Sequence, residues 1–227
     1  MVRRTLRIGH YFPMRLDHVS YVTSHEQISD TVQRIGSQIG TAFVDGGIHP
    51  QFGTRNFTAP LLNNQYIEIV CALDHPAAEK TPFGQAVTKK AEEGGGWLSW
   101  VFQVDSIDPL EKIFDRDSIV GHRRLPTGEE LSWRQIGVSE LVALRWTPFF
   151  IEWLSGTHPT NNGRAIAELD SIALNVDRKT TLDYFERIAA VDQLKKLVTF
   201  IEVGDSQIPK GIESMNFNVN GKKVIID

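Results

Sequence analysis

The chain has 227 residues, enough to bury a substantial hydrophobic core as one large domain or two small ones. Its 41% hydrophobic and 23% charged residues are ordinary for a globular protein, and its net charge of −4 argues against a nucleic-acid partner, which usually needs a basic surface. No apolar run approaches the roughly 20 residues of a membrane span, so a membrane partner is not expected either.

The single cysteine, Cys71, follows an apolar run and is interpreted as a buried strand thiol rather than a nucleophile. One thiol cannot form an internal disulfide, so the cysteine content suits a reducing cytoplasm, where we expect the protein. The charged start of the chain leads into mixed sequence, which argues against a signal peptide. We interpret residues 1–12 as a leader left by an upstream start or as a tag.

The first part of the chain predicts one strand, one helix and three more strands. Residues 16–23 alternate around Val19 and Tyr21, as a half-buried strand does. Ser24 is the predicted cap of a helix that ends at Gly40, because apolar residues recur between them at helical spacing. The further strands are predicted over 41–44, 54–60 and 66–72.

The same order of elements then recurs after a linker over residues 76–96, which is rich in Pro and Gly but has room for a short helix. Residues 97–105 predict a strand, and Asp108 opens a helix with Pro109 in its first turn. Three more strands are predicted over 122–125, 130–136 and 149–154. A strand-helix-strand-strand-strand unit that occurs twice implies an open curved sheet with helices on its outer face.

A third, shorter pass follows, with a strand over 169–176, a helix over 180–189 and strands over 197–203, 212–219 and 223–226. Asn220 and Gly221 form the hairpin turn between the last two strands. The predicted organisation is therefore α+β, with repeated βαβββ modules and a third, partial module. The expected boundaries are 13–75 for the first module, 76–96 for the linker, 97–157 for the second module and 165–227 for the third.

Several segments resemble the vicinal-oxygen-chelate superfamily, and most closely its glyoxalase-like branch. The opening strand at 16–19, the His-Pro-x-x-Gly-Thr-x-Asn segment at 49–56, and the module-closing strands at 66–69 and 146–153 carry this resemblance. It implies that paired modules form a half-barrel around a small-molecule site, that the ligand is a small molecule, and that the protein is a homodimer.

In metal-dependent members of the superfamily, the ligands come from the first and last strands of each module. The resemblance places His18, Glu68 and Glu152 at three of these positions, a set that suits Zn, Mn, Fe or Ni. The fourth position falls on Trp100 when residues 98–101 are laid on 16–19, and an indole nitrogen cannot ligate a metal. The expected cofactor is therefore either one divalent metal or none.

Without a metal, Glu68 or Glu152 is expected to act as general base, with His18 or His49 as acid or oxyanion partner. The expected pocket wall comprises Thr54, Arg55, Asn56 and Trp100. The catalytic hypotheses are a lyase, an isomerase or a ring-cleaving oxygenase acting on a small oxygenated substrate. The alternative is a non-catalytic protein that binds or sequesters a ligand in the same cavity, while a purely structural domain explains the paired glutamates least well.

Each candidate also has a structural interpretation. His18 would be a core histidine bound to the backbone, and His49 would brace its loop through the ring nitrogens. A buried carboxylate is costly without a partner, so the two glutamates would pair with arginines instead. The candidate arginines are Arg55, Arg134 and Arg145. His158 would either cover the pocket or belong to a turn.

Overall fold

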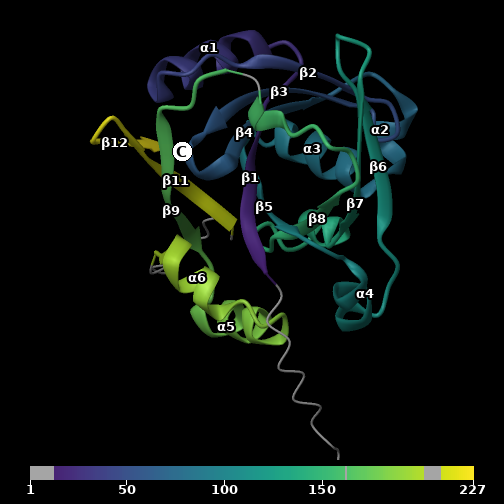
Figure 1. The fold of residues 1–227 in the computed structure, drawn as a ribbon, viewed down its shortest axis with the longest axis vertical. Coiled ribbons are helices and arrows are strands. Elements are labelled where there is room, and N and C mark those ends of the chain that lie inside the picture. The colour runs from purple at the N-terminus through teal and green to yellow at the C-terminus, as the bar shows by residue number, and fades with distance from the viewer. Residues whose placement is uncertain (1–12, 162, 202–210) are drawn as a thin grey trace, which may run out of the picture.

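Eight strands of the chain close into a barrel, and a smaller four-stranded sheet lies beside it (Figure 1). The structure, a computed structural model, describes residues 13–161, 163–201 and 211–227. The interpretation of residues 1–12 as a leader or tag therefore lies outside the described residues. Among those that are described, no helix is long and apolar enough to cross a membrane.

The first half of the barrel is one βαβββ module, as predicted. Its elements are β1 (Met14–Val22), α1 (Ile28–Ile39), β2 (Val44–His49), β3 (Thr54–Leu61) and β4 (Gln65–Ala72). The amphipathic helix α1 buries its isoleucines and ends at Gly40, whose φ of 66° suits glycine. Ser24 does not cap this helix, because the N-cap is Gln27, and Ser24 accepts a hydrogen bond from that residue's amide in the preceding turn.

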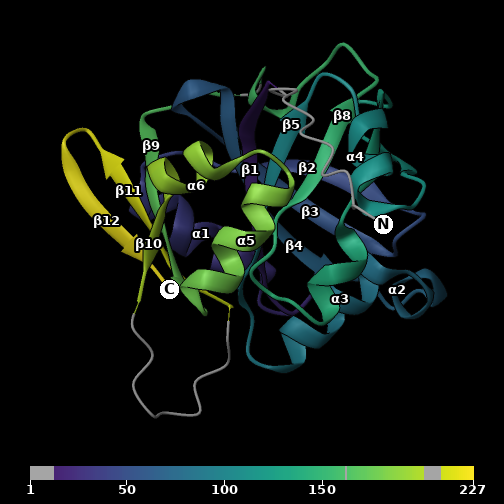
Figure 2. The ribbon, with the colours of Figure 1, turned by 90° about the horizontal axis from the view of Figure 1, so that it is seen from below.

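The predicted linker contains two helices, α2 (Pro76–Lys80) and α3 (Pro82–Glu92). Thr81 caps α3 by accepting a hydrogen bond from the amide of Gly84. Phe83 and Val87 of α3 pack in one cluster with apolar residues of the barrel strands. The linker is therefore an ordered cover on the barrel, seen beside β3 and β4 in Figure 2.

The second half repeats the module. It comprises β5 (Gly96–Val104), α4 (Asp108–Phe114), β6 (Ile119–Arg124), β7 (Glu130–Ile136) and β8 (Phe149–Trp153). Pro109 lies in the first turn of α4, as predicted. Three short 3-10 turns are also present, at Leu62–Asn64, Val138–Val142 and Pro159–Asn161.

The two halves join along two seams. The antiparallel pair β1–β5 forms a long ladder, and β2 meets β6 through the single pair Ile48 and Arg124. The strand order around the barrel is β1-β4-β3-β2-β6-β7-β8-β5. Each half therefore has the same internal order, β1-β4-β3-β2 in the first and β5-β8-β7-β6 in the second. The expected α+β fold with paired modules is confirmed, and the sheet closes into a whole barrel rather than a half-barrel.

The C-terminal part forms the second sheet, in the order β10-β9-β11-β12. Its elements are β9 (Ala167–Asn175), α5 (Arg178–Arg187), α6 (Val191–Leu197), β10 (Val198–Phe200), β11 (Gly211–Val219) and β12 (Lys222–Ile226). The strand order differs from that of the barrel modules. In the C-terminal sheet the first strand, β9, lies between β10 and β11, whereas in each barrel module the first strand pairs with the fourth. Residues 202 and 203 of the predicted strand over 197–203 lie outside the described residues.

Tryptophans of β5 attach this second sheet to the barrel. The Trp97 indole nitrogen donates to the carbonyl oxygen of Ile226 at 2.7 Å, and the Trp97 ring packs near Phe217. Trp100 is fully buried, donates to the carbonyl of Trp146 at 2.8 Å, and lies 5.5 Å from the Phe185 ring of α5. Trp100 therefore packs on the outer face of the barrel, in the core that it shares with the C-terminal sheet.

We predict that Trp100→Ala lowers the free energy of unfolding by about 3–5 kcal/mol, because it leaves a large cavity and an unpaired carbonyl in this core. Urea unfolding followed by circular dichroism measures the loss. Trp153→Ala is the control, since Trp153 is only half-buried and should cost less. A Trp100→Ala protein as stable as the wild type would contradict this packing.

Candidate active site

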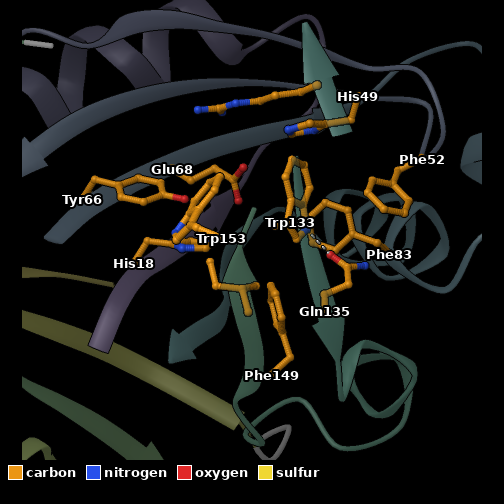
Figure 3. Close-up of a pocket in the computed structure, with 12 residues that line it drawn as sticks. His18, His49, Phe52, Tyr66, Glu68, Phe83, Trp133, Gln135, Phe149 and Trp153 are labelled. Carbon is orange, nitrogen blue, oxygen red and sulfur yellow. Dashed lines mark hydrogen bonds between the residues drawn. The ribbon is translucent and has the colours of Figure 1, made fainter. Parts of the chain in front are cut away.

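A pocket opens inside the barrel and has one polar and one apolar side (Figure 3). The titratable side chains come from β1, β2, β4 and β6, the amide of Gln135 comes from β7, and aromatic side chains form most of the remaining wall. The lining residues are His18, His49, Phe52, Tyr66, Glu68, Phe83, Arg123, Trp133, Gln135, Phe149, Ile151 and Trp153.

The pocket is small, with a cavity volume of about 30 Å³. A neighbouring hollow of about 110 Å³ shares Phe52, Phe83 and Gln135 with it. A compact reacting group therefore suits the pocket, and the neighbouring hollow offers space for the rest of a larger ligand.

A β-bulge in β1 places an aspartate behind His18. Leu16 pairs with Phe102 and His18 with Val101, so Asp17 is the extra residue of the ladder. Neighbouring side chains of a regular strand point to opposite faces, but at this bulge Asp17 Oδ2 lies 2.9 Å from His18 Nδ1. The His18 side chain lines the pocket, and its ring nitrogen Nε2 makes no hydrogen bond with the described residues.

Asp17 is completely buried and has a second histidine partner. Its Oδ1 atom lies 3.0 Å from Nε2 of His158, in the loop after β8. Burial alone would raise the pKa of Asp17, but the hydrogen bonds with His158 and His18 outweigh it and hold this pKa well below its usual value. His158 is thus part of the support for His18, packed against the rings of Tyr66 and Trp153.

Glu68 extends from β4 and is held by two hydrogen bonds. Ser20 Oγ donates to Oε2 at 2.7 Å, and Asn56 Nδ2 donates to Oε1 at 2.6 Å. Burial would raise the pKa of Glu68, but electrostatic interaction with the His18 and His49 side chains and these two donors lower it. Glu68 is therefore an ionised carboxylate in a largely aromatic pocket.

His49 and Tyr66 are neutral groups beside it. Burial lowers the pKa of His49 to about 4, with Glu68 opposing the shift and Arg123 adding to it. Its Nδ1 atom lies 2.9 Å from Thr54 Oγ1. The Tyr66 ring stacks on His18 with centroids 4.4 Å apart, and burial raises the pKa of its hydroxyl well above the usual value.

The second half of the barrel carries apolar residues at the equivalent positions. His18 pairs with Tyr66 across β1 and β4, and Val101 pairs with Phe149 across β5 and β8. Two residues further along, Glu68 corresponds to Ile151. The apolar side of the pocket is therefore the counterpart of the histidine and carboxylate side.

This comparison corrects two expected positions. The counterpart of His18 is Val101 rather than Trp100, and the counterpart of Glu68 is Ile151 rather than Glu152. A shift of one residue moves a side chain to the other face of a sheet. Accordingly, Trp100 lies in the outer core and not in the pocket. Glu152 lies on the outer face as well, where it accepts hydrogen bonds from the Ile107 amide at the start of α4 and from Arg134 of β7.

The other expected pocket residues separate into two groups. Thr54 and Asn56 are buried inside the barrel, where they bind His49 and Glu68. Arg55 points the other way, forms an ion pair with Asp45, and lies over the Phe57 ring. Arg134 does pair with Glu152, as the structural interpretation of that glutamate expected, whereas Arg145 pairs with Glu93.

The described residues do not form the expected metal site. The four strand positions hold His18, Glu68, Val101 and Ile151, so only two of them have donor atoms. Glu152 is on the outer face, and no group of three or more His, Cys, Asp or Glu side chains in the described part of the chain is arranged to hold a metal ion. We therefore derive no chemistry through a metal.

A family profile described as a glyoxalase-like domain matches residues 16–191. The chain belongs to this family. The match spans the whole barrel and the start of the C-terminal sheet, and it confirms the family that the sequence motifs indicated. No protein among the curated sequences matches the chain.

The chain is also similar to solved structures. A hypothetical protein from Staphylococcus aureus matches with a TM-score of 0.60 and 16% identity, over 94% of this chain and 84% of that one, and shares its fold. The methylmalonyl-CoA epimerase from Mycobacterium tuberculosis matches with a TM-score of 0.40 and 12% identity, over 61% and 85% of the two chains. A Streptomyces coelicolor methylmalonyl-CoA epimerase variant, in complex with 2-nitronate-propionyl-CoA, matches with a TM-score of 0.40 and 15% identity, over 62% and 98%.

Sequence reasoning missed several residues of this glyoxalase-like pocket. Asp17 was visible as a charged residue inside an apolar strand, next to a candidate histidine. Tyr66 and Phe149 were visible as strand residues two positions before Glu68 and Ile151. Arg123 had no such signal, because its strand exposes Ile119 and Val120 and buries the arginine.

We predict that His49 makes the glyoxalase-like domain less stable as the pH falls from about 6.5 to 4. The folded protein resists protonation of His49 until its pKa of about 4, whereas the unfolded chain takes up the proton near 6.5, so protons favour unfolding in this window. The difference between these two pKa values corresponds to a loss of about 3 kcal/mol in the free energy of unfolding. Urea unfolding at several pH values should show a loss in the wild type that His49→Gln reduces.

His25→Gln is the matched control, because His25 is exposed and its variant should follow the wild type. If His49→Gln loses stability with falling pH as steeply as the wild type, His49 is not held neutral by burial.

Proposed function

We propose that this protein is an isomerase-type enzyme that binds a small carbonyl compound in the barrel and moves a proton at the carbon beside the carbonyl group. The observation that carries the proposal is the arrangement around His18. Asp17, which is buried, fixes one nitrogen of the His18 ring, and the other nitrogen makes no hydrogen bond with any described residue; the side chain lines the pocket.

His18 is the proposed proton acceptor. Asp17 fixes the tautomer that leaves Nε2 with a free lone pair, as the aspartate of a catalytic triad does for its histidine. When Nε2 takes a proton, the ring becomes a cation between the ionised Asp17 and Glu68. Both carboxylates stabilise that cation, which strengthens the base within a pocket of low polarity.

Glu68 is the supporting charge rather than the proton acceptor. Both of its oxygen atoms accept hydrogen bonds from Ser20 and Asn56, and its pKa is lowered, so a proton on Glu68 is disfavoured. A base with a pKa far below the working pH is a poor acceptor for a carbon-bound proton. This assignment differs from the expectation that a glutamate acts as the base.

The substrate oxygen is placed on the opposite side of the reacting carbon, near the neutral side chain of His49. With Thr54 donating to Nδ1 of His49, the Nε2 hydrogen of His49 is available to this oxygen. The apolar half of the pocket, including Phe149 and Ile151, excludes water from the intermediate.

The step is balanced without an outside reactant. The C–H bond breaks, its proton goes to Nε2 of His18, and its electron pair forms an enolate whose negative charge is on the carbonyl oxygen. The proton then returns from His18 to carbon and the carbonyl bond re-forms. When the enolate turns over before the proton returns, the proton adds to its other face, and a carbon with three other, different substituents then has the opposite configuration.

We predict that the protein catalyses hydrogen–deuterium exchange beside a carbonyl group. Proton NMR in deuterium oxide follows the loss of the α-hydrogen signals of 2-oxobutanoate and pentane-2,3-dione. His18→Gln should lower the enzyme-dependent rate by about 100-fold or more, the usual scale for a lost general base. Glu68→Gln should also lower it, because the His18 cation loses one of its two carboxylates.

Glu152→Gln is the matched control, since this glutamate lies on the outer face and its variant should exchange at the wild-type rate. A wild-type protein that binds these compounds but does not accelerate exchange would contradict the proposal. That result would favour the non-catalytic binding protein, which the narrow aromatic pocket also suits.

A further inference from the structure

Arg123 is a buried cation in the pocket for which the proposed step has no role. It lies on β6, its residue is only 3% exposed, and its side chain lines the cavity with His49 and Glu68. The neighbouring Arg124 is exposed to solvent on the outer face of the same strand. Arg123 occupies the position in the second half of the barrel that His49 occupies in the first, because Arg123 pairs with Leu131 as His49 pairs with Thr54.

The guanidinium group has no anionic partner in the described part of the chain. No Asp or Glu oxygen there lies within 4.0 Å of its nitrogen atoms, and the buried Nε atom has no hydrogen-bond partner. The carboxylate among the lining residues, Glu68, is already bound to Ser20 and Asn56. A buried charge without a partner is costly, so a ligand that supplies the partner gains this interaction.

The backbone makes room for this arginine at Gly46. A Cβ atom placed there would lie 2.9 Å from Arg123 Nη1 and 2.2 Å from Asn56 Oδ1. A residue with a side chain at this position would therefore force Asn56 and Arg123 to shift. The glycine therefore lets the guanidinium group and the amide that binds Glu68 lie against β2, with His49 three residues along the same strand.

We infer that Arg123 is the binding site for a carboxylate group of the substrate, which makes the substrate a small 2-oxo carboxylate. The inference rests on the proposed function and names the substrate class of the same pocket. A planar guanidinium group matches a carboxylate through two parallel hydrogen bonds. The carbonyl group beside that carboxylate then lies near His49, and the next carbon lies toward His18.

The pocket favours a monoanion. Arg123 is the only permanently charged cation among the lining residues of the described structure, because burial keeps His49 neutral. The ionised Glu68 repels a second negative charge. Arg123 has a second effect, since its charge stabilises the enolate that forms after proton removal.

Calorimetric titration of the full chain tests the inference with 2-oxobutanoate and its neutral analogue pentane-2,3-dione, in which a methyl group replaces one carboxylate oxygen. The wild type should bind the carboxylate at least tenfold more tightly. Arg123→Met should lose this preference and keep its affinity for the dione. Arg124→Met, the matched control, should bind both compounds as the wild type does.

Thermal unfolding without ligand gives a second measurement that does not depend on activity. Arg123→Met removes an unpaired buried charge and keeps most of the side-chain volume, so its melting temperature should be higher than that of the wild type. Addition of 2-oxobutanoate should raise the melting temperature of the wild type and of Arg124→Met, but not that of Arg123→Met.

The inference is overturned if the wild type shows no preference for the carboxylate, or if Arg123→Met retains the preference. These results are distinct from a failure of the proposed proton transfer. Carboxylate-selective binding without deuterium exchange would support the Arg123 site and contradict the enzyme. Exchange with the dione but no preference for 2-oxobutanoate would support the enzyme and overturn the Arg123 site.

Discussion

The β-bulge at Asp17 is the local constraint on which the polar half of the pocket depends. β1 is the one strand that pairs with both β4 of its own module and β5 of the other. A regular strand here would send Asp17 and His18 to opposite faces. Because the bulge gives Asp17 no partner on β5, its carboxylate turns to meet the ring of His18 and reaches His158 with its other oxygen.

The two barrel halves have the same strand order and opposite chemistry. The first half contributes His18, Tyr66 and Glu68, and the second half contributes Val101, Phe149 and Ile151 at the equivalent positions. A symmetric pair of modules would surround a ligand with similar groups on both sides. The divergence instead gives a pocket in which a polar ligand can bind in one orientation, with its reacting end toward the first module.

Much of the fold was predictable from sequence, because strand alternation and helical spacing recur in the same order in both halves. His18 and Glu68 were predictable for the same reason, since each is a polar residue whose strand neighbours are apolar. Trp100 and Glu152 were misplaced because residue types were aligned between the modules, while the register is set by hydrogen bonds. The ladder between β1 and β5 contains two irregularities, at Leu16/His18 and at Ser20/Tyr21, and such shifts leave no clear mark in a single sequence.

Arg123 shows a different limit. The usual rule places apolar side chains of a strand toward the interior, yet β6 exposes Ile119 at 45% and Val120 at 54% and buries Arg123. The interior of this barrel is a binding cavity as well as a core, so hydrophobicity does not indicate which face of β6 points inward. The fact that decides the face is the register of β6 against β7 and β2, which is known only from the folded chain.

The charges inside the barrel differ in how they are stabilised, and that difference separates structural from ligand-binding roles. Asp17 and Glu68 each have at least two hydrogen-bond partners from the chain itself, and these partners offset the cost of burial and fix the position of each carboxylate. Arg123 has no such partner in the described residues. A folded protein that retains one unpaired buried cation beside two satisfied anions is less stable without ligand than with one. The same charge that lowers the stability of the empty barrel is therefore the one that can distinguish an anionic ligand from a neutral one.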